Sequence, residues 1–527
     1  MGAAGHTLRK LTVVGVALLL GACASLPPPV PSPPTQALTD VADTSLARTV
    51  AAAANGQPPV LSGFRLLPEA AFAFDARISL ARHAEKSLDV QYYLINNDDV
   101  GLLLLRELRD AAARGVRVRL LVDDLYTGGE DQLFGTLAAH PNVEVRLFNP
   151  LPSRATSLTA RLALSLHEFS RINHRMHNKL LVADNSMAIS GGRNIANEYF
   201  MRNTAANFID MDVLSCGPVV REMSAAFDRY WNSEQVRQIE NMAPLRLPRD
   251  AAQHRFDELV SRAAPDVPIR PRDVLDQPPL GEQLATGRLG LRWAKAHLFA
   301  DDPAKITRTA EAAYKGSVTE GALGVINAAH TEVQIISPYF IPGQQGLAMM
   351  KTAIARGGRI SVVTNSLGAT DEPLAYAGYE RYRGDMLKIG VDIREIAPEL
   401  TGRSGRFGEF GKSISRLHAK VAVIDRQRLF IGSMNLDHRS AAVNTELGLV
   451  IDSAEVVGDF ERLIGPDRRE RIRLGYTLRL GPDGKRVQWI ETDDQGGDVV
   501  HEDQPGQFLW LRLKNWLLLP IVGEELL

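Results

Sequence analysis

Apolar and polar positions follow two periods along the chain, and the same succession of periods occurs twice. The first half contains a predicted strand, a helix and two more strands, at 87–95, 101–114, 116–124 and 143–150. The second half repeats this order at 332–341, 346–356, 359–366 and 391–398. Strands that alternate with helices predict an α/β fold with a largely parallel or mixed sheet, here formed twice. A repeat of about 240 residues is a domain duplication rather than a solenoid.

Each half also carries the same spacing of polar residues, H-x-K-x4-D, in two copies that lie 241 positions apart. The six residues are His177, Lys179, Asp184, His418, Lys420 and Asp425. In an extended strand, residues i and i+2 point to one face, so we expect the His and the Lys of each copy to project together. As members of the motif, both Asp residues are assigned to the catalytic set, and we favour support of the strand and turn that follow over contact with the substrate.

A glycine-containing turn follows each copy after six residues. It reads Gly-Gly-Arg-Asn in the first half and ends at Asn194, and it reads Gly-Ser-Met-Asn in the second half and ends at Asn435. Glycine permits a tight turn, and backbone N–H groups in such a turn can approach an anion closely.

The paired motifs resemble those of the phospholipase D superfamily, and the resemblance extends from about residue 61 to residue 465. It implies a duplicated α/β sandwich with one active site at the interface of the two halves. It also implies cleavage of a phosphodiester, with His177 as the nucleophile and His418 as the acid and base. The opposite assignment of the two His residues remains open.

The residue types suit this chemistry. A neutral His can attack phosphorus and form a phosphohistidine, while a second, protonated His donates to the departing alcohol and then activates the acceptor. Lys179 and Lys420 would hold the phosphoryl oxygens, and Asn194 and Asn435 would donate further hydrogen bonds to them. We expect neither a metal ion nor another cofactor.

Each His of such a site needs a carboxylate that orients its distal nitrogen. Glu446 lies in a predicted strand after the second turn, and the equivalent strand of the first half contains Asp210 and Asp212. Aligning the two strands pairs Asp210 with Glu446, and Asp212 is the competing candidate.

Four further segments resemble bacterial cardiolipin synthases, most closely the C type, at 91–98, 191–200, 299–305 and 336–343. This resemblance implies transfer of a phosphatidyl group to the hydroxyl of a second phospholipid, typically phosphatidylglycerol. A hydrolytic phospholipase D, a nuclease of the same superfamily and a catalytically silent lipid-binding lipoprotein are the alternatives. We expect phospholipid partners and no nucleic acid.

The N-terminus has the pattern of a lipoprotein signal. Arg9 and Lys10 precede an apolar or small-residue run of 11 residues, Leu11 to Gly21, which is too short to span a bilayer and is followed by Ala22 and Cys23. We expect lipidation of Cys23, and a Pro-rich tether at 26–35 would let the body stand off the membrane. The predicted location is the bacterial cell envelope, with the body facing the periplasm.

Composition narrows these predictions. The chain has 527 residues, 45% of them apolar, and a net charge of −2, which excludes a generally basic nucleic-acid binder. Two cysteines are too few for a disulfide framework.

The predicted division of the chain has six parts. They are a signal peptide (1–22), a lipidated Cys with its tether (23–60), a first repeat (61–235), a connecting segment (236–295), a second repeat (296–465) and a C-terminal extension with an apolar terminal helix (466–527).

Basic residues also cluster before the first motif, at Arg154, Arg161, Arg171 and Arg175. We interpret them as the lining of an anionic entry path, or else as a solvated charged face.

Overall fold

The computed structural model describes residues 25–264, 269–398, 413–464, 475–492 and 497–506. Cys23 and the predicted terminal helix lie outside the described residues. The described residues contain no helix whose length and apolar content would let it cross a membrane.

The first half is built on a sheet with the order β1-β8-β6-β5-β2-β3-β4-β9. Its strands are β1 (Ser62–Leu67), β2 (Ser87–Tyr92), β3 (Arg117–Asp123), β4 (Val143–Phe148), β5 (Leu180–Ala183), β6 (Met187–Gly191), β8 (Asp212–Cys216) and β9 (Val236–Gln238). β2, β3 and β4 run parallel, and the other neighbours are antiparallel. The strands predicted at 87–95, 116–124 and 143–150 are β2, β3 and β4.

The second half repeats this order as β10-β17-β16-β15-β11-β12-β13-β18, which β19 and β20 extend. Its strands are β10 (Arg292–Ala300), β11 (Glu332–Ile336), β12 (Arg359–Asn365), β13 (Asp392–Ile396), β15 (Val421–Ile424), β16 (Arg428–Gly432), β17 (Leu447–Asp452), β18 (Gly475–Leu480), β19 (Val487–Thr492) and β20 (Asp498–His501). β1 pairs with β10, so these strands of the two halves form one continuous sheet. The predicted duplicated α/β architecture is confirmed.

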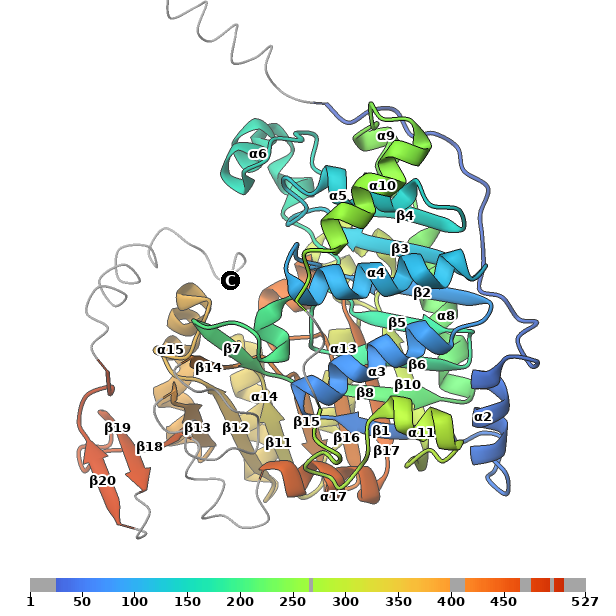
Figure 1. The fold of residues 1–527 in the computed structure, drawn as a ribbon. Coiled ribbons are helices and arrows are strands. Elements are labelled where there is room, and N and C mark those ends of the chain that lie inside the picture. Colours follow the sequence, from blue (N-terminus) through green and yellow to red (C-terminus); the bar gives the residue numbers. More distant parts are fainter. Residues whose placement is uncertain (1–24, 265–268, 399–412, 465–474, 493–496, 507–527) are drawn as a thin grey trace, which may run out of the picture.

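Helices cover the sheets (Figure 1). In the first half they are α2 (Ser45–Ala53), α3 (Ala70–His83), α4 (Asp99–Ala113), α5 (Asp131–Ala138), α6 (Leu158–Leu164), α7 (Phe169–Ile172) and α8 (Pro218–Trp231). In the second half they are α12 (Ala310–Tyr314), α13 (Val318–Asn327), α14 (Gly343–Ala355), α15 (Pro373–Lys388) and α17 (Ala454–Ile464). α4 shows the local logic: Asp98 caps its first turn, leucines fill its buried face, and Gly115, with φ +98°, follows its end.

A hydrophobic core lies between the two halves. It combines α8 and α17 with apolar side chains from both sheets, among them Leu121, Val213, Val423 and Leu449. A separate core in the first half lies under α3, α4 and α5. Because the two halves share a core, the residues that they present to each other are held in a fixed relation.

The connecting segment completes the first half. α10 (Arg249–Val260) packs on α4 and α5, α11 (Leu280–Thr286) packs on α3, and the short α9 (Ile239–Met242) follows β9. These residues therefore form part of the outer layer of the first half.

The predicted tether differs from the structure. Residues 25–44 form an extended strap that follows the first half down to α2 (Figure 1). Arg119 donates to the backbone oxygen of Thr35 at 2.9 Å, the N–H of Ala37 donates to Asp228 at 2.9 Å, and Arg146 donates to Ser32 at 3.0 Å. The expectation of a free spacer over 26–35 was wrong for Ser32 and Thr35, because buried arginines of β3 and β4 need acceptors that the strap supplies.

Candidate active site

The two motif histidines lie where the halves meet, and each is fixed to the backbone of the other half. The N–H of His418 donates to the oxygen of Ile209, and the N–H of His177 donates to the oxygen of Thr445, both at 2.8 Å. β14 (Ile414–Leu417), which leads into His418, pairs in parallel with β7 (Ala206–Ile209). Next to His177, a single parallel bridge between Met176 and Thr445 joins the two halves in the same way.

This pairing brings each imidazole to a carboxylate of the opposite half. Nδ1 of His418 lies 2.6 Å from Oδ2 of Asp210, and Nδ1 of His177 lies 3.0 Å from Oε2 of Glu446. Both carboxylates are fully buried. With Nδ1 donating to a carboxylate, Nε2 of each ring keeps its lone pair for chemistry.

The competing carboxylate of the first half has other partners. Asp212 accepts from Arg77 at 2.9 Å and from Arg193 at 3.1 Å, and all three side chains are buried. A buried carboxylate paired with two guanidinium groups is a structural ion cluster. The structure therefore brings Asp210 to a motif His and directs Asp212 into the body of the first half.

Burial sets the charge state of the site. It lowers the pKa of His177 to about 4, against the opposing effect of Glu446, and it also lowers the pKa of His418. Burial opposes the ionised form of Asp210, but the hydrogen bond from His418 and the positive charge of Lys420 outweigh it and lower the pKa of that carboxyl. Glu446 shows the same balance, and its pKa is also lowered, chiefly by His177. At pH 7 the site therefore holds two neutral imidazoles and two carboxylates.

The motif lysines are as buried as the histidines. Nζ of Lys179 donates to the backbone oxygen of His177 at 2.6 Å, and Nζ of Lys420 donates to that of His418 at 2.5 Å. Burial lowers the pKa of Lys179 to about 7 and that of Lys420 to about 8, in spite of the nearby carboxylates. A bound anion would therefore favour their protonated forms strongly.

The two motif asparagines are buried at the ends of the glycine turns. Nδ2 of Asn194 donates to the hydroxyl of Tyr199 at 2.9 Å, and the backbone N–H of Asn435 donates to Ser440 at 3.0 Å. Among the described residues, neither side-chain oxygen has a hydrogen-bond partner. The predicted contact of these side chains with phosphate stays a prediction.

Two hydroxyl groups that the sequence analysis did not single out hold Glu446 in place. Ser433 donates to Oε2 of Glu446, and Ser440 donates to Oε1 at 2.8 Å. The first half has Gly192 in place of Ser433, and a Cβ there would lie 2.0 Å from Oδ1 of Asp210. The Gly-Gly and Gly-Ser difference between the two turns was the signal for this asymmetry.

Aromatic rings flank both imidazoles and were also missed. The ring of Tyr93 lies 5.1 Å from that of His177 in an edge-on arrangement, and Tyr199 lies 5.1 Å from His418 in the same way. Phe208 adds a second ring at 5.0 Å from His418. These rings exclude water from the imidazoles, which is consistent with their lowered pKa values.

A family model described as "Cardiolipin synthase, PLD-like domain" matches residues 78–231 and 323–466, which contain both motifs and both carboxylates. The chain belongs to this family of phospholipase D-like enzymes. Within the described residues, no three His, Cys, Asp or Glu side chains come together as a candidate metal site.

Two curated relatives place the chain within the cardiolipin synthase family. It is 35% identical to cardiolipin synthase C of Escherichia coli (strain K12) over 462 residues, which cover 87% of this chain and 94% of that protein. It is 26% identical to cardiolipin synthase A of Pseudomonas fluorescens, over 86% of this chain and 79% of that protein. A crystal structure of phosphatidylserine synthase from Haemophilus influenzae shares the fold, with a TM-score of 0.56 at 13% identity over 91% of this chain and 98% of that one.

The third residue of each family motif lies away from the imidazoles. The Asp184 carboxylate accepts the backbone N–H groups of Glu85, Lys86 and Ser87 at 2.8–2.9 Å. Asp425 accepts those of His330, Thr331 and Glu332 at 2.7–3.1 Å. Each Asp therefore ties the end of one central strand to the start of its antiparallel neighbour, which supports the expected structural role and argues against their place in a catalytic set.

Replacing Asp184 with alanine is expected to cost about 2–3 kcal/mol of unfolding free energy, because three backbone N–H groups lose a charged acceptor. Activity per folded molecule should stay within about threefold of the native value, since no motif His or Lys touches Asp184. Denaturant titration alongside active-site-normalised kcat measures both quantities. A large loss of kcat at unchanged stability would contradict the structural role.

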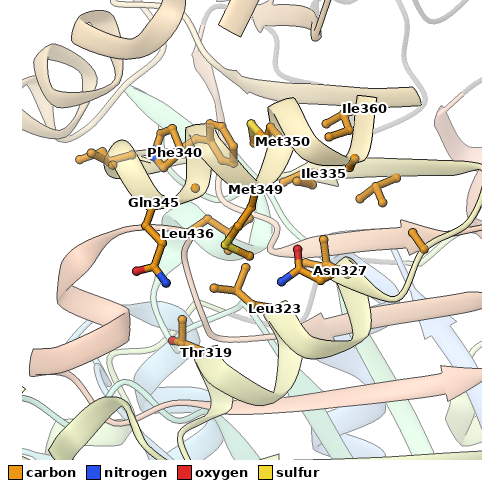
Figure 2. A pocket seen from close by; sticks show the side chains of 18 of the residues that line it. Thr319, Leu323, Asn327, Ile335, Phe340, Gln345, Met349, Met350, Ile360 and Leu436 are labelled. Carbon is orange, nitrogen blue, oxygen red and sulfur yellow. The ribbon is translucent and has the colours of Figure 1, made fainter. Parts of the chain in front are cut away.

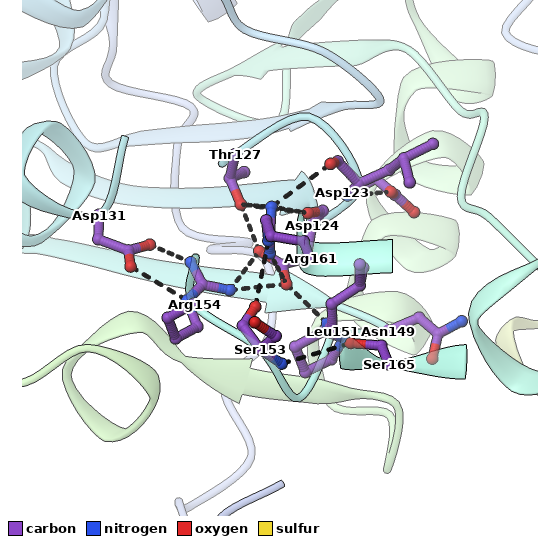
Figure 3. A network of polar contacts seen from close by, with 12 residues as sticks. Asp123, Asp124, Thr127, Asp131, Asn149, Leu151, Ser153, Arg154, Arg161 and Ser165 are labelled. Carbon is purple, nitrogen blue, oxygen red and sulfur yellow. Dashed lines mark hydrogen bonds and ion pairs between the residues drawn. The ribbon is translucent and has the colours of Figure 1, made fainter. Parts of the chain in front are cut away.

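The basic residues before His177 do not line an open path. Asp124 accepts from Arg154 and from Arg161, each at 2.7 Å, and from the N–H of Leu151 (Figure 3). Arg175 pairs with Asp123 at 3.1 Å, and Arg171 pairs with Glu168 at 2.5 Å. The interpretation as an entry path was wrong for these four, because their charges are neutralised by carboxylates or buried against backbone oxygens.

Proposed function

We propose that this chain is a phosphatidyltransferase that moves a phosphatidyl group between phospholipids through a phosphohistidine. The observation that carries the proposal is the pair of buried imidazoles, each held at Nδ1 by a carboxylate of the other half and each accompanied by a lysine. The similarity to cardiolipin synthase C over 87% of the chain supports a lipid substrate. With both imidazoles at the meeting of the halves, one can attack phosphorus while the other serves the leaving oxygen, as an in-line displacement requires.

In the first step, Nε2 of His177 attacks phosphorus while its Nδ1–H donates to Glu446. The bond from phosphorus to the leaving alcohol oxygen breaks, and His418 supplies the proton that this oxygen needs. His418 is neutral in the empty site, but the charge of a bound phosphodiester and the adjacent Asp210 favour its protonated form. Lys179 and Lys420 stabilise the charge that develops on the phosphoryl oxygens.

In the second step, the neutral His418 removes a proton from the acceptor hydroxyl. The acceptor oxygen attacks phosphorus, and His177 departs with its electron pair restored. With the hydroxyl of phosphatidylglycerol as acceptor the product is cardiolipin, and with water it is phosphatidic acid. The transfer reaction is favoured here because the similarity to cardiolipin synthases extends along most of the chain.

The direct test uses the whole protein in mixed vesicles of phosphatidylglycerol and phosphatidylethanolamine with EDTA present, and mass spectrometry of the lipids. Cardiolipin is the expected product, and it should be absent with the His177→Ala variant. Omitting phosphatidylethanolamine identifies the donor. Phosphatidic acid as the main product would indicate a hydrolase, and the absence of any lipid product would overturn the proposal in favour of another phosphodiester.

We further propose that Cys23 carries the lipid anchor and that the body faces the periplasm. The short apolar run before Cys23 supports this location. Radiolabelled palmitate should label the native chain and not the Cys23→Ser variant. Label on both chains would place the attachment elsewhere.

Anion binding is expected to weaken as pH rises through 7–8. The pKa values of Lys179 and Lys420 lie near 7 and 8, so both cations are present at pH 6 and largely lost at pH 9. Inhibition by tungstate, whose charge is constant over this range, should become at least about tenfold weaker between these pH values. The Lys179→Arg variant keeps one permanent charge and should lose less affinity. A pH-independent inhibition constant would contradict the assignment.

A further inference from the structure

A cavity of about 400 Å³ lies in the second half between α13 and α14. Apolar side chains of both helices, of β11, of the segment between β11 and α14, and of the segment after Asn435 form its wall: Leu323, Ile335, Phe340, Met349, Met350 and Leu436. Figure 2 shows the side chains of Leu323 and Met349 pointing toward each other, with Leu436 beside them and Thr319, Asn327 and Gln345 around them. This volume is within the range of about 300–1,000 Å³ that small-molecule sites occupy.

The duplication provides an internal comparison. The corresponding helices of the first half, α3 and α4, pack against each other, and α4 buries Leu102, Leu103, Leu104, Leu105 and Leu108. In α14, Met350 alone of its thirteen residues is buried. The same layer of the fold is thus filled by side chains in one half and left open in the other. Apolar surface that one copy buries and the other leaves open indicates a ligand site.

The cavity adjoins the active site through two short segments. Phe340 forms a bridge with Leu436, and the N–H of Ile341 donates to the oxygen of Leu436 at 2.8 Å. Leu436 directly follows Asn435 of the second glycine turn, and Ser440, a few residues later, holds Glu446. The second glycine turn therefore contacts the carboxylate partner of His177 through Ser433, and the segment that follows the turn forms part of the cavity wall.

We infer that this cavity binds one acyl chain of the phospholipid substrate while its phosphate lies between His177 and His418; the inference rests on the proposed function. Methionine, leucine, isoleucine and phenylalanine side chains match a hydrocarbon chain and offer no partner for a polar head group. At the margin of the cavity, the carboxylate of Glu332 is neutralised by Arg359 at 3.1 Å and by Arg426. The site makes turnover depend on chain length, because a short acyl chain does not reach along the cavity.

The test fills the cavity and compares substrates of two chain lengths. Met349→Trp should lower kcat/KM for dioleoyl lipids by at least about tenfold and leave that for dihexanoyl lipids within about twofold. Ala355→Trp is the matched control, because Ala355 is exposed on the same helix and does not line the cavity. Leu323→Trp, from the opposite wall, repeats the test if Met349→Trp unfolds. An equal loss for both chain lengths, or no loss for either, would overturn the inference.

A binding measurement separates this inference from the proposed function. The fluorescent fatty acid cis-parinaric acid should bind the His177→Ala protein as tightly as the native protein, and Met349→Trp should weaken that binding by at least about tenfold. Parinarate binding without any lipid turnover would reject the proposed function and retain the apolar site. Lipid turnover in a protein whose parinarate affinity is insensitive to Met349→Trp would reject the site and retain the function.

Discussion

Replacing His177 with alanine is expected to lower kcat/KM for phosphatidyl transfer by at least about 10⁴-fold, because the covalent route through a phosphohistidine loses its nucleophile. The neutral state of His177 supports this role: burial lowers its pKa to about 4, so its lone pair is available at pH 7. Replacing His418 should cost about 10²–10⁴-fold with natural lipids, whose alkoxide leaving groups need a proton.

A substrate with an activated leaving group distinguishes the two histidines. Phosphatidyl-p-nitrophenol releases a stable anion without a proton, so His418→Ala should give a burst of one p-nitrophenolate per site and then stall for lack of a base. His177→Ala should give no burst. The reverse pattern would exchange the two roles, which the sequence left open. His167→Ala, at a partly exposed position outside the motifs, is the control and should behave as the native enzyme.

The second large effect is expected at the orienting carboxylates. Glu446→Gln and Asp210→Asn should each lower kcat by about 10²–10⁴-fold with little change in KM. An amide can present its N–H to Nδ1 and stabilise the wrong tautomer, and it removes the charge that supports an imidazolium. Rates from dihexanoyl lipids, together with thermal unfolding, separate this loss from misfolding.

Asp212→Asn is the matched control for Asp210→Asn. It weakens the buried cluster with Arg77 and Arg193, and breaking a buried ion pair of this kind typically costs about 3–5 kcal/mol. We therefore expect a clear loss of stability and a nearly native kcat for the folded fraction. A kcat loss equal to that of Asp210→Asn at native stability would show that the two carboxylates have been assigned wrongly.

The sequence by itself determined the elements and the reactive groups. The period-2 runs at 87–95 and 359–366 and the helical period at 101–114 were matched by β2, β12 and α4, since each pattern is a local consequence of which side chains must be buried. The spacing of His177 and Lys179 placed both on one face for the same local reason. The repetition of these patterns predicted two halves, and the resemblance of the paired motifs to the phospholipase D superfamily implied that the halves share one site.

The partners of buried charges were decided by the tertiary structure. Asp210 and Asp212 are two positions apart, so the continuous strand expected from the sequence gives them the same face and cannot choose between them. In the structure this strand is interrupted, since β7 ends at Ile209 and β8 begins at Asp212. The choice depends on what lies opposite: His418, 208 positions away, at Asp210, and Arg77 and Arg193 at Asp212. The contacts of the arginines before His177 and of the strap at Thr35 were also decided by the partners that the fold places beside them. A buried charged group pairs with the counter-charge or polar backbone group that the folded chain places beside it. The separation of two residues along the sequence does not predict whether the fold brings them together.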